Sequence, residues 1–203
     1  EFVNTAHPDI IVVTGDMVDG AGDLVEPLSD RLAALHPPLG KFAVVGNHEL
    51  YAGLPQSLAF LKAGGFRVLR GESVELNANG VRFRMAGVDN PAEHTAQIRV
   101  FTNEDPILPA AGPGREFTIL LKHQPRLNPA SVGRFDLQLS GHTHGGQIFP
   151  FHFFVRLTYP YFQGLYALPQ GGWLYVSRGT GSWGPPMRLL APREVTLFVI
   201  EPE

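Results

Sequence analysis

The stretch from Leu139 to Gln147, which reads LSGHTHGGQ, continues an apolar run that predicts a strand over 135–139. Its glycines let the backbone bend on both sides of the His-Thr-His sequence, so His142 and His144 need not point to opposite faces, as they would in a continuing strand. Two neutral imidazoles presented in this way can bind a metal centre. An isolated His-x-His pair, however, is more often two exposed loop histidines, so the rest of the chain has to distinguish these interpretations.

Three other apolar runs end in residues of the same kind. Continuous runs of β-branched and apolar residues are typical of strands that are buried on both faces of a sheet. The runs, each with the polar residues that follow it, are 9–14 with Asp16, 41–45 with Asn47 and His48, and 117–121 with His123. Because ligands gather at the carboxyl ends of strands in open α/β sheets, we expect these side chains and the two histidines to lie close together.

The remaining patterns predict that helices and strands alternate at first and that an antiparallel sheet follows. The sequence Asn-Ala-Asn-Gly at 77–80 favours a hairpin between two of the later strands. For the aromatic segment 149–166 we expect an edge hairpin or a hydrophobic cover for the sheet, with a lipid-facing or substrate-capping flap as the alternative. Helices are expected over 1–7, 24–35, 54–63, 93–101 and 126–134, and further strands over 66–69, 73–76, 81–86, 173–177 and 195–200.

The composition limits the classes of function. The 203 residues fit a single domain spanning 1–203, which is long enough to bury a core without disulfide or metal staples. The absence of cysteine excludes disulfides, thiolate nucleophiles and sulfur-rich zinc sites. A net charge of -3 without a long Lys/Arg run argues against binding of long nucleic acids, but it is compatible with a small phosphorylated substrate. No apolar stretch reaches the roughly 20 residues that a membrane-spanning helix needs.

The polar residues at the strand ends suit a divalent metal. They offer carboxylate oxygen, amide oxygen and imidazole nitrogen, which hard or borderline divalent metals prefer. Two such ions about 3.5 to 4 Å apart can hold the oxygens of a phosphoryl group and lower the pKa of the attacking water. Each residue alone has a structural explanation, such as a cap, a turn or a hydrogen-bonded core histidine, but their joint occurrence favours a metal-dependent hydrolase. The candidate ligands are Asp16, Asn47, His123, His142 and His144.

The motifs as a set resemble those of the calcineurin-like metallophosphoesterases. They are GDMVD at 15–19, GNHE at 46–49, His123 and GHTH at 141–144. Residues 141–147 and the VSRGTG sequence at 176–181 are most similar to the bacterial, membrane-associated branch of YkuE-type phosphohydrolases. The resemblance covers nearly the whole chain. It implies a four-layer α/β/β/α sandwich with the metals at one end of its sheets, in a protein that is membrane-associated when intact.

The resemblance also implies how two metal ions share the ligands. Asp16 would bridge both ions, and His144 would belong to one of the two sites only. The other site would be completed by Asn47, His123 and His142. Sites of this kind accept Mn, Fe, Zn, Mg or Ni, so the sequence leaves the metal open.

Further residues are expected beside the metals. By resemblance, His48 would lie near the substrate and protonate the leaving oxygen, with Asp19 orienting its ring. Glu49 would support the ligands without binding metal. Arg178 and Arg188, on either side of a glycine-rich loop, are candidates for contact with a substrate phosphate.

The chain departs from the family at the first motif. Members begin with a strand ending in Asp-x-His, which gives two ligands to the ion shared by Asp16 and His144, and no Asp-x-His occurs in this sequence. His7 is no substitute, because it precedes a strand instead of following one. One site therefore has four protein ligands and the other has two. We expect the first strand and its motif to lie in a longer, natural form of the protein.

The leading hypothesis is a phosphodiesterase that uses a metal-bound hydroxide as nucleophile. It would act on small phosphorylated or lipid-like substrates and contact a membrane surface. Two alternatives stay open. One is a catalytically impaired binding or scaffold module with the same fold, and the other is a mononuclear hydrolase that uses only the site of Asn47, His123 and His142.

Overall fold

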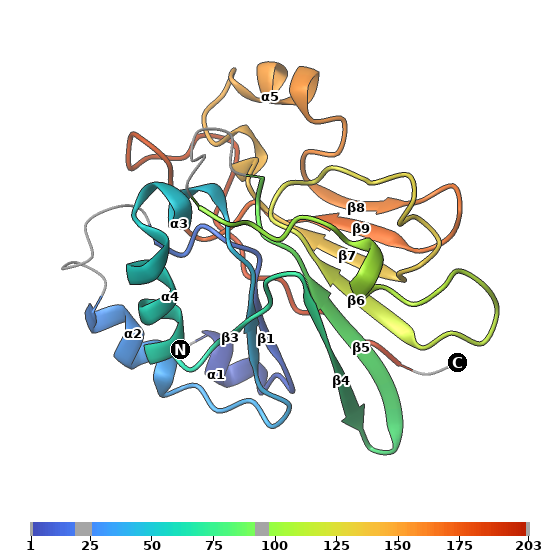
Figure 1. Ribbon diagram of the computed structural model, residues 1–203. Coiled ribbons are helices and arrows are strands. Elements are labelled where there is room, and N and C mark those ends of the chain that lie inside the picture. The colour runs from blue at the N-terminus through green and yellow to red at the C-terminus, as the bar shows by residue number, and fades with distance from the viewer. Residues whose placement is uncertain (1, 19–25, 92–97, 202–203) are drawn as a thin grey trace.

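The computed structural model describes residues 2–18, 26–91 and 98–201, which form two facing β-sheets with helices beside the smaller one (Figure 1). The helices are α1 (Phe2–Ala6), α2 (Glu26–Ala33), α3 (Asn47–Tyr51), α4 (Leu54–Ala63) and α5 (His152–Thr158), with the 3-10 helices η2 (Asp105–Ile107) and η3 (His144–Gly146). The strands are β1 (Ile11–Val13), β2 (Lys41–Ala43), β3 (Arg67–Val68), β4 (Glu72–Ala78), β5 (Val81–Gly87), β6 (Phe117–Leu121), β7 (Leu137–Ser140), β8 (Gly164–Ala167) and β9 (Trp173–Val176).

The two sheets differ in their strand directions. The smaller sheet has the order β1-β2-β3, and both of its pairs are parallel. The larger sheet has the order β4-β5-β6-β7-β9-β8, and its four central strands are parallel. Antiparallel pairing is confined to the two edges, where β4 pairs with β5 and β8 with β9. The predicted antiparallel sheet is therefore wrong for its centre, because the long connections after β5, β6 and β7 bring the chain back in the same direction.

Apolar side chains fill the space between the sheets and the space behind the smaller one. Between the sheets, Phe42 from β2 packs with Met85 from β5 and Ile119 from β6. Behind the smaller sheet, Ala43 faces Leu61 of α4. The sandwich of α/β layers expected from the sequence is confirmed by this arrangement.

The outer face of the larger sheet is covered mainly by loops in the described residues. Phe135 and the end of η2 pack there against Leu120 of β6. The helix expected over 126–134 is not formed, and residues 129–133 make turns instead. The side-chain oxygen of Asn128 accepts a hydrogen bond from the N–H of Ala130, and Gly133 has a φ of 85°, so local turn chemistry replaces the helix.

Two predicted strands and one predicted helix also need correction. The strand over 9–14 is only half-buried, because β1 lies at the edge of its sheet. Residues 195–200 form no strand, since an apolar run needs a neighbouring strand to complete its hydrogen-bond ladder and none pairs with it. Of the helix expected over 93–101, residues 98–101 are not helical and residues 92–97 lie outside the described part of the chain.

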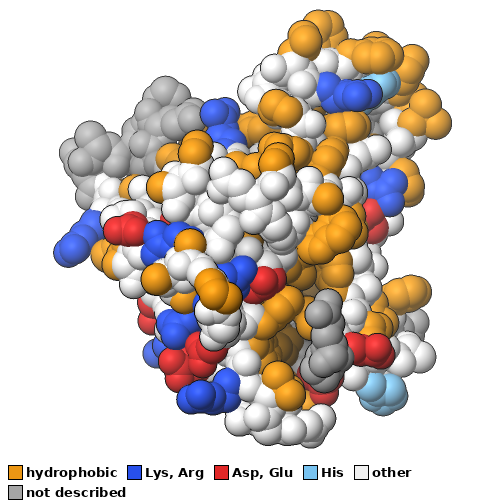
Figure 2. Space-filling view, turned by 90° about the vertical axis from the view of Figure 1, so that its right-hand side faces the viewer, with side chains coloured by type: hydrophobic (Ala, Val, Ile, Leu, Met, Phe, Trp, Pro, Cys, Tyr) orange, Lys and Arg blue, Asp and Glu red, His pale blue; other side chains and the backbone are white. Residues whose placement is uncertain are grey.

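The aromatic segment divides into a covering part and a protruding part. Phe162 is buried, and Tyr161 and Tyr166 pack on the outer face of the larger sheet, as a hydrophobic cover would. The preceding residues form α5, which stands away from the sheets in Figure 1. Its side chains include Phe154 at 64% exposure and Leu157 at 84%. Figure 2 shows hydrophobic side chains gathered at the top of the molecule, where α5 lies.

Candidate metal centre

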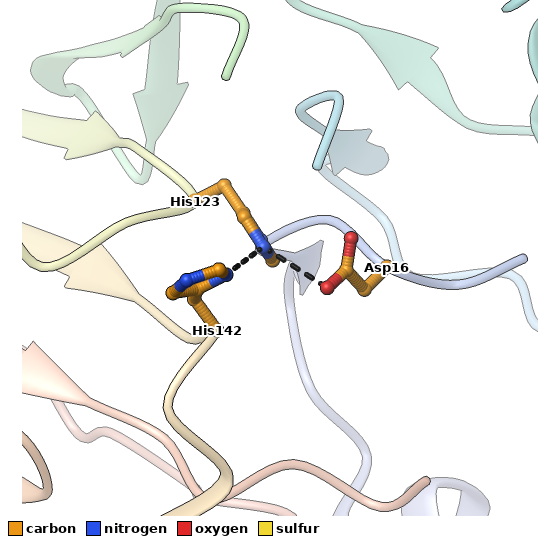
Figure 3. Close-up of side chains that lie close together, drawn as sticks. All are labelled: Asp16, His123 and His142. Atoms are coloured by element: carbon orange, nitrogen blue, oxygen red, sulfur yellow. Dashed lines mark hydrogen bonds and ion pairs between the residues drawn. The ribbon is translucent and has the colours of Figure 1, made fainter. Parts of the chain in front are cut away.

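Side chains from the carboxyl ends of four strands meet at one end of the two sheets. Asp16 follows β1, Asn47 follows β2 as the first residue of α3, His123 follows β6, and His142 follows β7. Figure 3 shows Asp16 and His142 on either side of the His123 ring. The sheet ends therefore bring together residues that are far apart in sequence, as the strand-end pattern predicted.

The potential ligand atoms of the other three residues lie within hydrogen-bonding distance of His123 Nε2. His123 Nε2 is 3.0 Å from Asp16 Oδ2, 3.0 Å from Asn47 Oδ1 and 3.1 Å from His142 Nδ1. His142 Nδ1 is in turn 2.9 Å from Asn47 Oδ1. His123 is only 1% exposed, so water has little access to its side of the cluster.

The cluster contains more hydrogen-bond acceptors than donors. His123 Nδ1 lies 2.7 Å from the carbonyl oxygen of Thr14, which can only accept, so Nδ1 carries a proton and a neutral ring has its lone pair on Nε2. That lone pair faces the carboxylate of Asp16 and the amide oxygen of Asn47. Acceptors that face one another repel unless positive charge lies among them. The donor set of one carboxylate, one amide oxygen and two imidazoles therefore fits a divalent metal ion.

The pKa shifts in the cluster favour an ionised Asp16 and a neutral His142, both of which can bind a metal. Burial raises the pKa of Asp16, but the His123 ring and His48 together lower it, and the net pKa is about 2. Burial lowers the pKa of His123, but the Asp16 carboxylate, the Thr14 carbonyl and Glu49 together raise it, and the net shift is upward. Burial and His123 together lower the pKa of His142 to about 4, which keeps its ring in the neutral, metal-binding form.

The backbone of the candidate ligands is in an uncommon conformation. Asp16 has a φ of 56°, His142 of 70° and His144 of 51°, in the left-handed region that non-glycine residues rarely adopt. Gly46 permits a close approach to Asp16, since a Cβ at Gly46 would lie 2.2 Å from Asp16 Oδ1. Strain of this kind is typical of functional sites, where the surrounding structure holds it in place.

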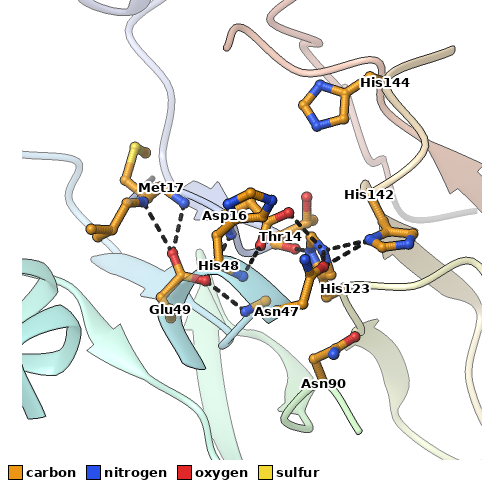
Figure 4. A network of polar contacts seen from close by, with 12 residues as sticks. Thr14, Asp16, Met17, Asn47, His48, Glu49, Asn90, His123, His142 and His144 are labelled. Carbon is orange, nitrogen blue, oxygen red and sulfur yellow. Dashed lines mark hydrogen bonds and ion pairs between the residues drawn. The ribbon is translucent and has the colours of Figure 1, made fainter. Parts of the chain in front are cut away.

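Glu49 fixes the two loops that present Asp16 and Asn47. It is 0% exposed, and its carboxylate accepts hydrogen bonds from the backbone N–H groups of Asp16, Met17, Val18 and Gly46 at 2.7 to 3.2 Å (Figure 4). Burial raises the pKa of Glu49, and the backbone donors act in the opposite direction. The four bonds explain how a carboxylate can stay so deeply buried, and they make Glu49 a support for the ligand loops.

Tyr159 is a contact that the motif analysis missed. Its hydroxyl lies 2.9 Å from His142 Nε2, the ring nitrogen on the far side from the cluster. A metal-ligating histidine usually hydrogen-bonds through its second nitrogen, and this bond fixes the orientation of the ring. Tyr159 immediately follows α5 in the aromatic segment, so the only signal in the sequence was its place in that segment.

His144 does not join the cluster. Its Nδ1 lies 3.0 Å from Nη2 of Arg188, which also donates to the carbonyl oxygen of Arg178 at 2.7 Å. Figure 4 shows the His144 ring apart from the other labelled side chains of the network. Burial and Arg188 lower the pKa of His144 to about 4. A guanidinium that donates to Nδ1 places the proton of the neutral ring on Nε2, so His144 must give up this bond before Nε2 can bind a metal.

The two arginines considered for phosphate binding are engaged with the protein itself. Arg178 forms an ion pair with Glu194. Arg188 donates from Nε to the carbonyl oxygen of Gly181 at 2.7 Å and from Nη1 to that of Ala191 at 3.2 Å. In this arrangement the guanidinium groups of both arginines are bound by acceptors of the protein itself.

The ligand cluster and the motifs around it agree with a match to a known family. The family model described as calcineurin-like phosphoesterase matches residues 1–146. The chain belongs to this family. It is therefore a metal-dependent phosphoesterase, a hydrolase of phosphoric esters.

Sequence relatives of this phosphoesterase come from several organisms. It is 48% identical over 195 residues to an uncharacterized metallophosphoesterase of Aquifex aeolicus, a match that covers 96% of this chain and 73% of that protein. It is 34% identical over 221 residues to the uncharacterized metallophosphoesterase YkuE of Bacillus subtilis, covering 98% and 70%. A Bos taurus protein named transmembrane protein with metallophosphoesterase domain is 35% identical over 214 residues, covering 98% of this chain and 47% of that protein. The resemblance to YkuE-type proteins is confirmed.

Solved structures support the fold of this phosphoesterase. It superposes on a putative 5'-nucleotidase of Staphylococcus aureus with a TM-score of 0.55 and 15% sequence identity, covering 95% of this chain and 46% of that one. At this identity the likeness concerns the fold alone.

The remaining predicted residues of the phosphoesterase are placed as follows. His48 lies in α3, where its backbone N–H donates to Asp16 Oδ1 at 2.9 Å and its ring centre is 5.7 Å from that of Tyr51. Asp19 lies outside the described residues. Among the described residues, no helix combines the length and apolar character that crossing a membrane requires.

Proposed function

We propose that this phosphoesterase hydrolyses phosphodiesters and that Asp16, Asn47, His123 and His142 hold one of two divalent metal ions. The observation that carries the proposal is the meeting of Asp16 Oδ2, Asn47 Oδ1, His123 Nε2 and His142 Nδ1 at 2.9 to 3.1 Å, where acceptors face one another whenever the His123 ring is neutral. In the bound form the metals would activate a water molecule as nucleophile and bind the phosphoryl oxygens.

The side chains of the chain itself have distinct tasks in this proposal. Asp16 accepts a hydrogen bond from the His48 backbone, which keeps its Oδ2 turned toward His123. His48 follows the ligand Asn47 in α3. In this scheme it donates a proton to the leaving alcohol oxygen. Asp19 orients the His48 ring in this scheme. His144 would help to hold a second ion, and Arg188 would then have to release its Nδ1.

A mononuclear hydrolase is the second candidate. It is supported by the separation of His144, with its bond to Arg188, from the four clustered residues. The two candidates differ in metal content, because the mononuclear form requires one ion per chain and the dinuclear form two. Equilibrium dialysis against Mn²⁺ followed by elemental analysis distinguishes them.

The proposed activity is tested by hydrolysis of bis(4-nitrophenyl) phosphate with Mn²⁺ and with EDTA. We expect hydrolysis that EDTA abolishes and that Asn47→Ala reduces by more than about 100-fold, since one metal ligand is lost. Asn4→Ala, on the exposed surface of α1, is the matched control and should retain full activity. If the Asn47 variant in EDTA were as active as the wild type with Mn²⁺, the mechanism would be refuted. A folded chain that binds Mn²⁺ without hydrolysing any ester would favour the scaffold alternative.

We also propose that α5 rests on a membrane surface, where lipid-like phosphate esters would be accessible. Phe151, Phe153, Phe154 and Leu157 are all more than half exposed, a cluster that water disfavours. No Asp or Glu occurs between Asp136 and Glu194, so the segment that carries α5 is cationic. Apolar side chains with nearby positive charge suit an interface with anionic lipids.

Sedimentation with phosphatidylserine vesicles tests the membrane contact. Leu157→Ser should lower the bound fraction, because it removes the most exposed of these apolar side chains. The control is Val81→Ser at the hairpin of the larger sheet, which is 47% exposed and remote from α5. Equal binding of both variants and the wild type would show that α5 is not the contact.

A further inference from the structure

A pocket of about 240 Å³ opens directly beside the candidate metal ligands. Its lining includes the candidate ligands Asn47 and His142 together with Arg126 and Tyr159. Pockets for drug-sized ligands have about 300 to 1,000 Å³, so this one suits a smaller group. A phosphoryl group bound at the metal end would direct the rest of the substrate into this space.

Arg126 is a cation without an acidic partner in this pocket. Its guanidinium carbon lies 5.0 Å from the centre of the Tyr159 ring, which orients it by a cation–π contact. The other arginines that pair with carboxylates include Arg70 with Asp89 and Arg115 with Asp136. In the described part of the chain, Arg126 has no such ion pair, and its side chain is available to an anion.

Asn90 provides a second polar feature of the same pocket. It is 3% exposed, and its side-chain nitrogen donates to the carbonyl oxygen of Pro91 at 2.8 Å. Its Oδ1 is buried and has no hydrogen-bond partner within the structure described. An orphaned acceptor in a pocket is satisfied when a ligand brings a hydroxyl or an N–H group.

The pocket therefore joins three chemical preferences in one space. The metal end takes a phosphoryl group, Arg126 attracts negative charge, and Asn90 accepts from a hydroxyl or amine. Tyr159 connects the first two, since its hydroxyl contacts His142 and its ring carries Arg126. A leaving group without a charge, a hydroxyl or an N–H group would use neither Arg126 nor Asn90.

We propose that this pocket is the subsite for the leaving group and that Arg126 binds a second anionic group of the substrate there. The inference rests on the proposed function of the metal centre. It assigns the substrate to the class of phosphate esters whose alcohol part is hydroxylated and carries an additional phosphate or carboxylate.

The test compares two phosphonates that the enzyme cannot hydrolyse, propylphosphonate and propane-1,3-diylbisphosphonate, which differ only in the second anionic group. Calorimetric titration of the Mn²⁺-loaded chain is expected to show tighter binding of the bisphosphonate by roughly tenfold, as for a hydrogen bond to a charged group. Arg126→Gln should remove this preference, and Arg126→Lys should restore part of it because it keeps the charge. Neither change should alter the binding of propylphosphonate by more than about twofold.

Arg99→Gln is the matched control. Arg99 is exposed and stacks on Phe101 with 4.8 Å between the guanidinium carbon and the ring centre, but it does not line the pocket. This variant removes the same charge and the same type of contact, and it should keep the preference for the bisphosphonate. An equal loss in both variants would assign the preference to net charge alone and overturn the subsite.

The outcomes separate the subsite from the metal centre. Metal-dependent binding of propylphosphonate without any gain from the second anion would overturn the subsite and leave the proposed function intact. Failure of both phosphonates to bind in the presence of Mn²⁺ would contradict the proposed function, and the subsite with it.

Discussion

His142 and His144 are two residues apart, yet they lie in different chemical surroundings. Nδ1 of His142 faces Asn47 Oδ1 and His123 Nε2, two atoms that can bind the same metal ion. Nδ1 of His144 instead faces a guanidinium, and its backbone carbonyl accepts from the same arginine at 3.3 Å. One histidine is thus placed among potential ligands and the other is held by a cation.

The difference teaches that a His-x-His sequence does not define a single site. Both histidines have positive φ, and Gly145, inside η3, also has a φ of 60°. This backbone turns the two rings away from each other, so their partners decide their chemistry. For His142 these partners come from the ends of other strands, and for His144 the partner is Arg188, beyond the glycine-rich loop that follows β9.

Removing each histidine separately is the strongest test of the difference between His142 and His144. We expect His142→Ala to lower the affinity of the chain for Mn²⁺ by more than about 100-fold, because a ligand is lost from the four-residue cluster. His144→Ala should change the affinity for the tighter-binding ion by less than about threefold. Isothermal titration calorimetry measures both. Equal losses would mean that the two histidines share one ion.

Glu49→Gln tests the support behind the cluster. An amide has one acceptor oxygen and places its NH₂ group against backbone N–H donors, so we expect the chain to lose about 2 to 4 kcal/mol of unfolding free energy. Urea denaturation of the metal-free protein measures this change. Glu75→Gln on β4, an exposed residue, is the control and should change stability by less than about 0.5 kcal/mol. A tolerated Glu49 variant would show that the ligand loops hold their shape without it.

Tyr159→Phe removes only the hydroxyl that contacts His142. The expected result is a roughly tenfold weaker affinity for Mn²⁺, the lower end of what loss of an outer partner of a ligating histidine causes. The ring under Arg126 is retained, so the preference for the bisphosphonate over propylphosphonate should persist. Unchanged metal affinity would mean that His142 is held by its backbone conformation alone.

Arg188→Gln is expected to have the smallest effect. It removes donors to the carbonyl oxygens of Arg178 and Gly181 in a partly exposed loop, at a cost of about 1 kcal/mol in unfolding free energy. The affinity of the four-residue cluster for Mn²⁺ should stay within about twofold. A large loss of metal affinity would show that the two regions are coupled, contrary to the comparison.

Much of the fold and the candidate site could be predicted from the sequence. Helix α4 and strand β6 have the predicted bounds, because strong apolar patterns of the right period specify them. The strand ends bring Asp16, Asn47 and His123 together as expected, since topology places the carboxyl ends of parallel strands at one edge.

The features that the sequence did not predict depend on distant partners. Tyr159 contacts His142 through a hydroxyl whose position depends on how α5 packs, and no local pattern encodes that packing. Arg188 has the charge and the N–H donors that suit a phosphate, but these donors bind the backbone carbonyl oxygens of Gly181 and Ala191. The apolar run 195–200 predicted a strand, yet a strand also requires a sheet edge that accepts it.

The left-handed backbone at Asp16, His142 and His144 has a consequence for how this family can change over time. Left-handed conformations cost an ordinary residue roughly 1 to 2 kcal/mol, whereas glycine adopts them freely. Selection for stability of the fold alone would therefore replace these three residues by glycine. Descendants that no longer need the metal are expected to drift toward glycine there first, so that the loss of chemistry leaves a recognisable mark in an otherwise intact fold.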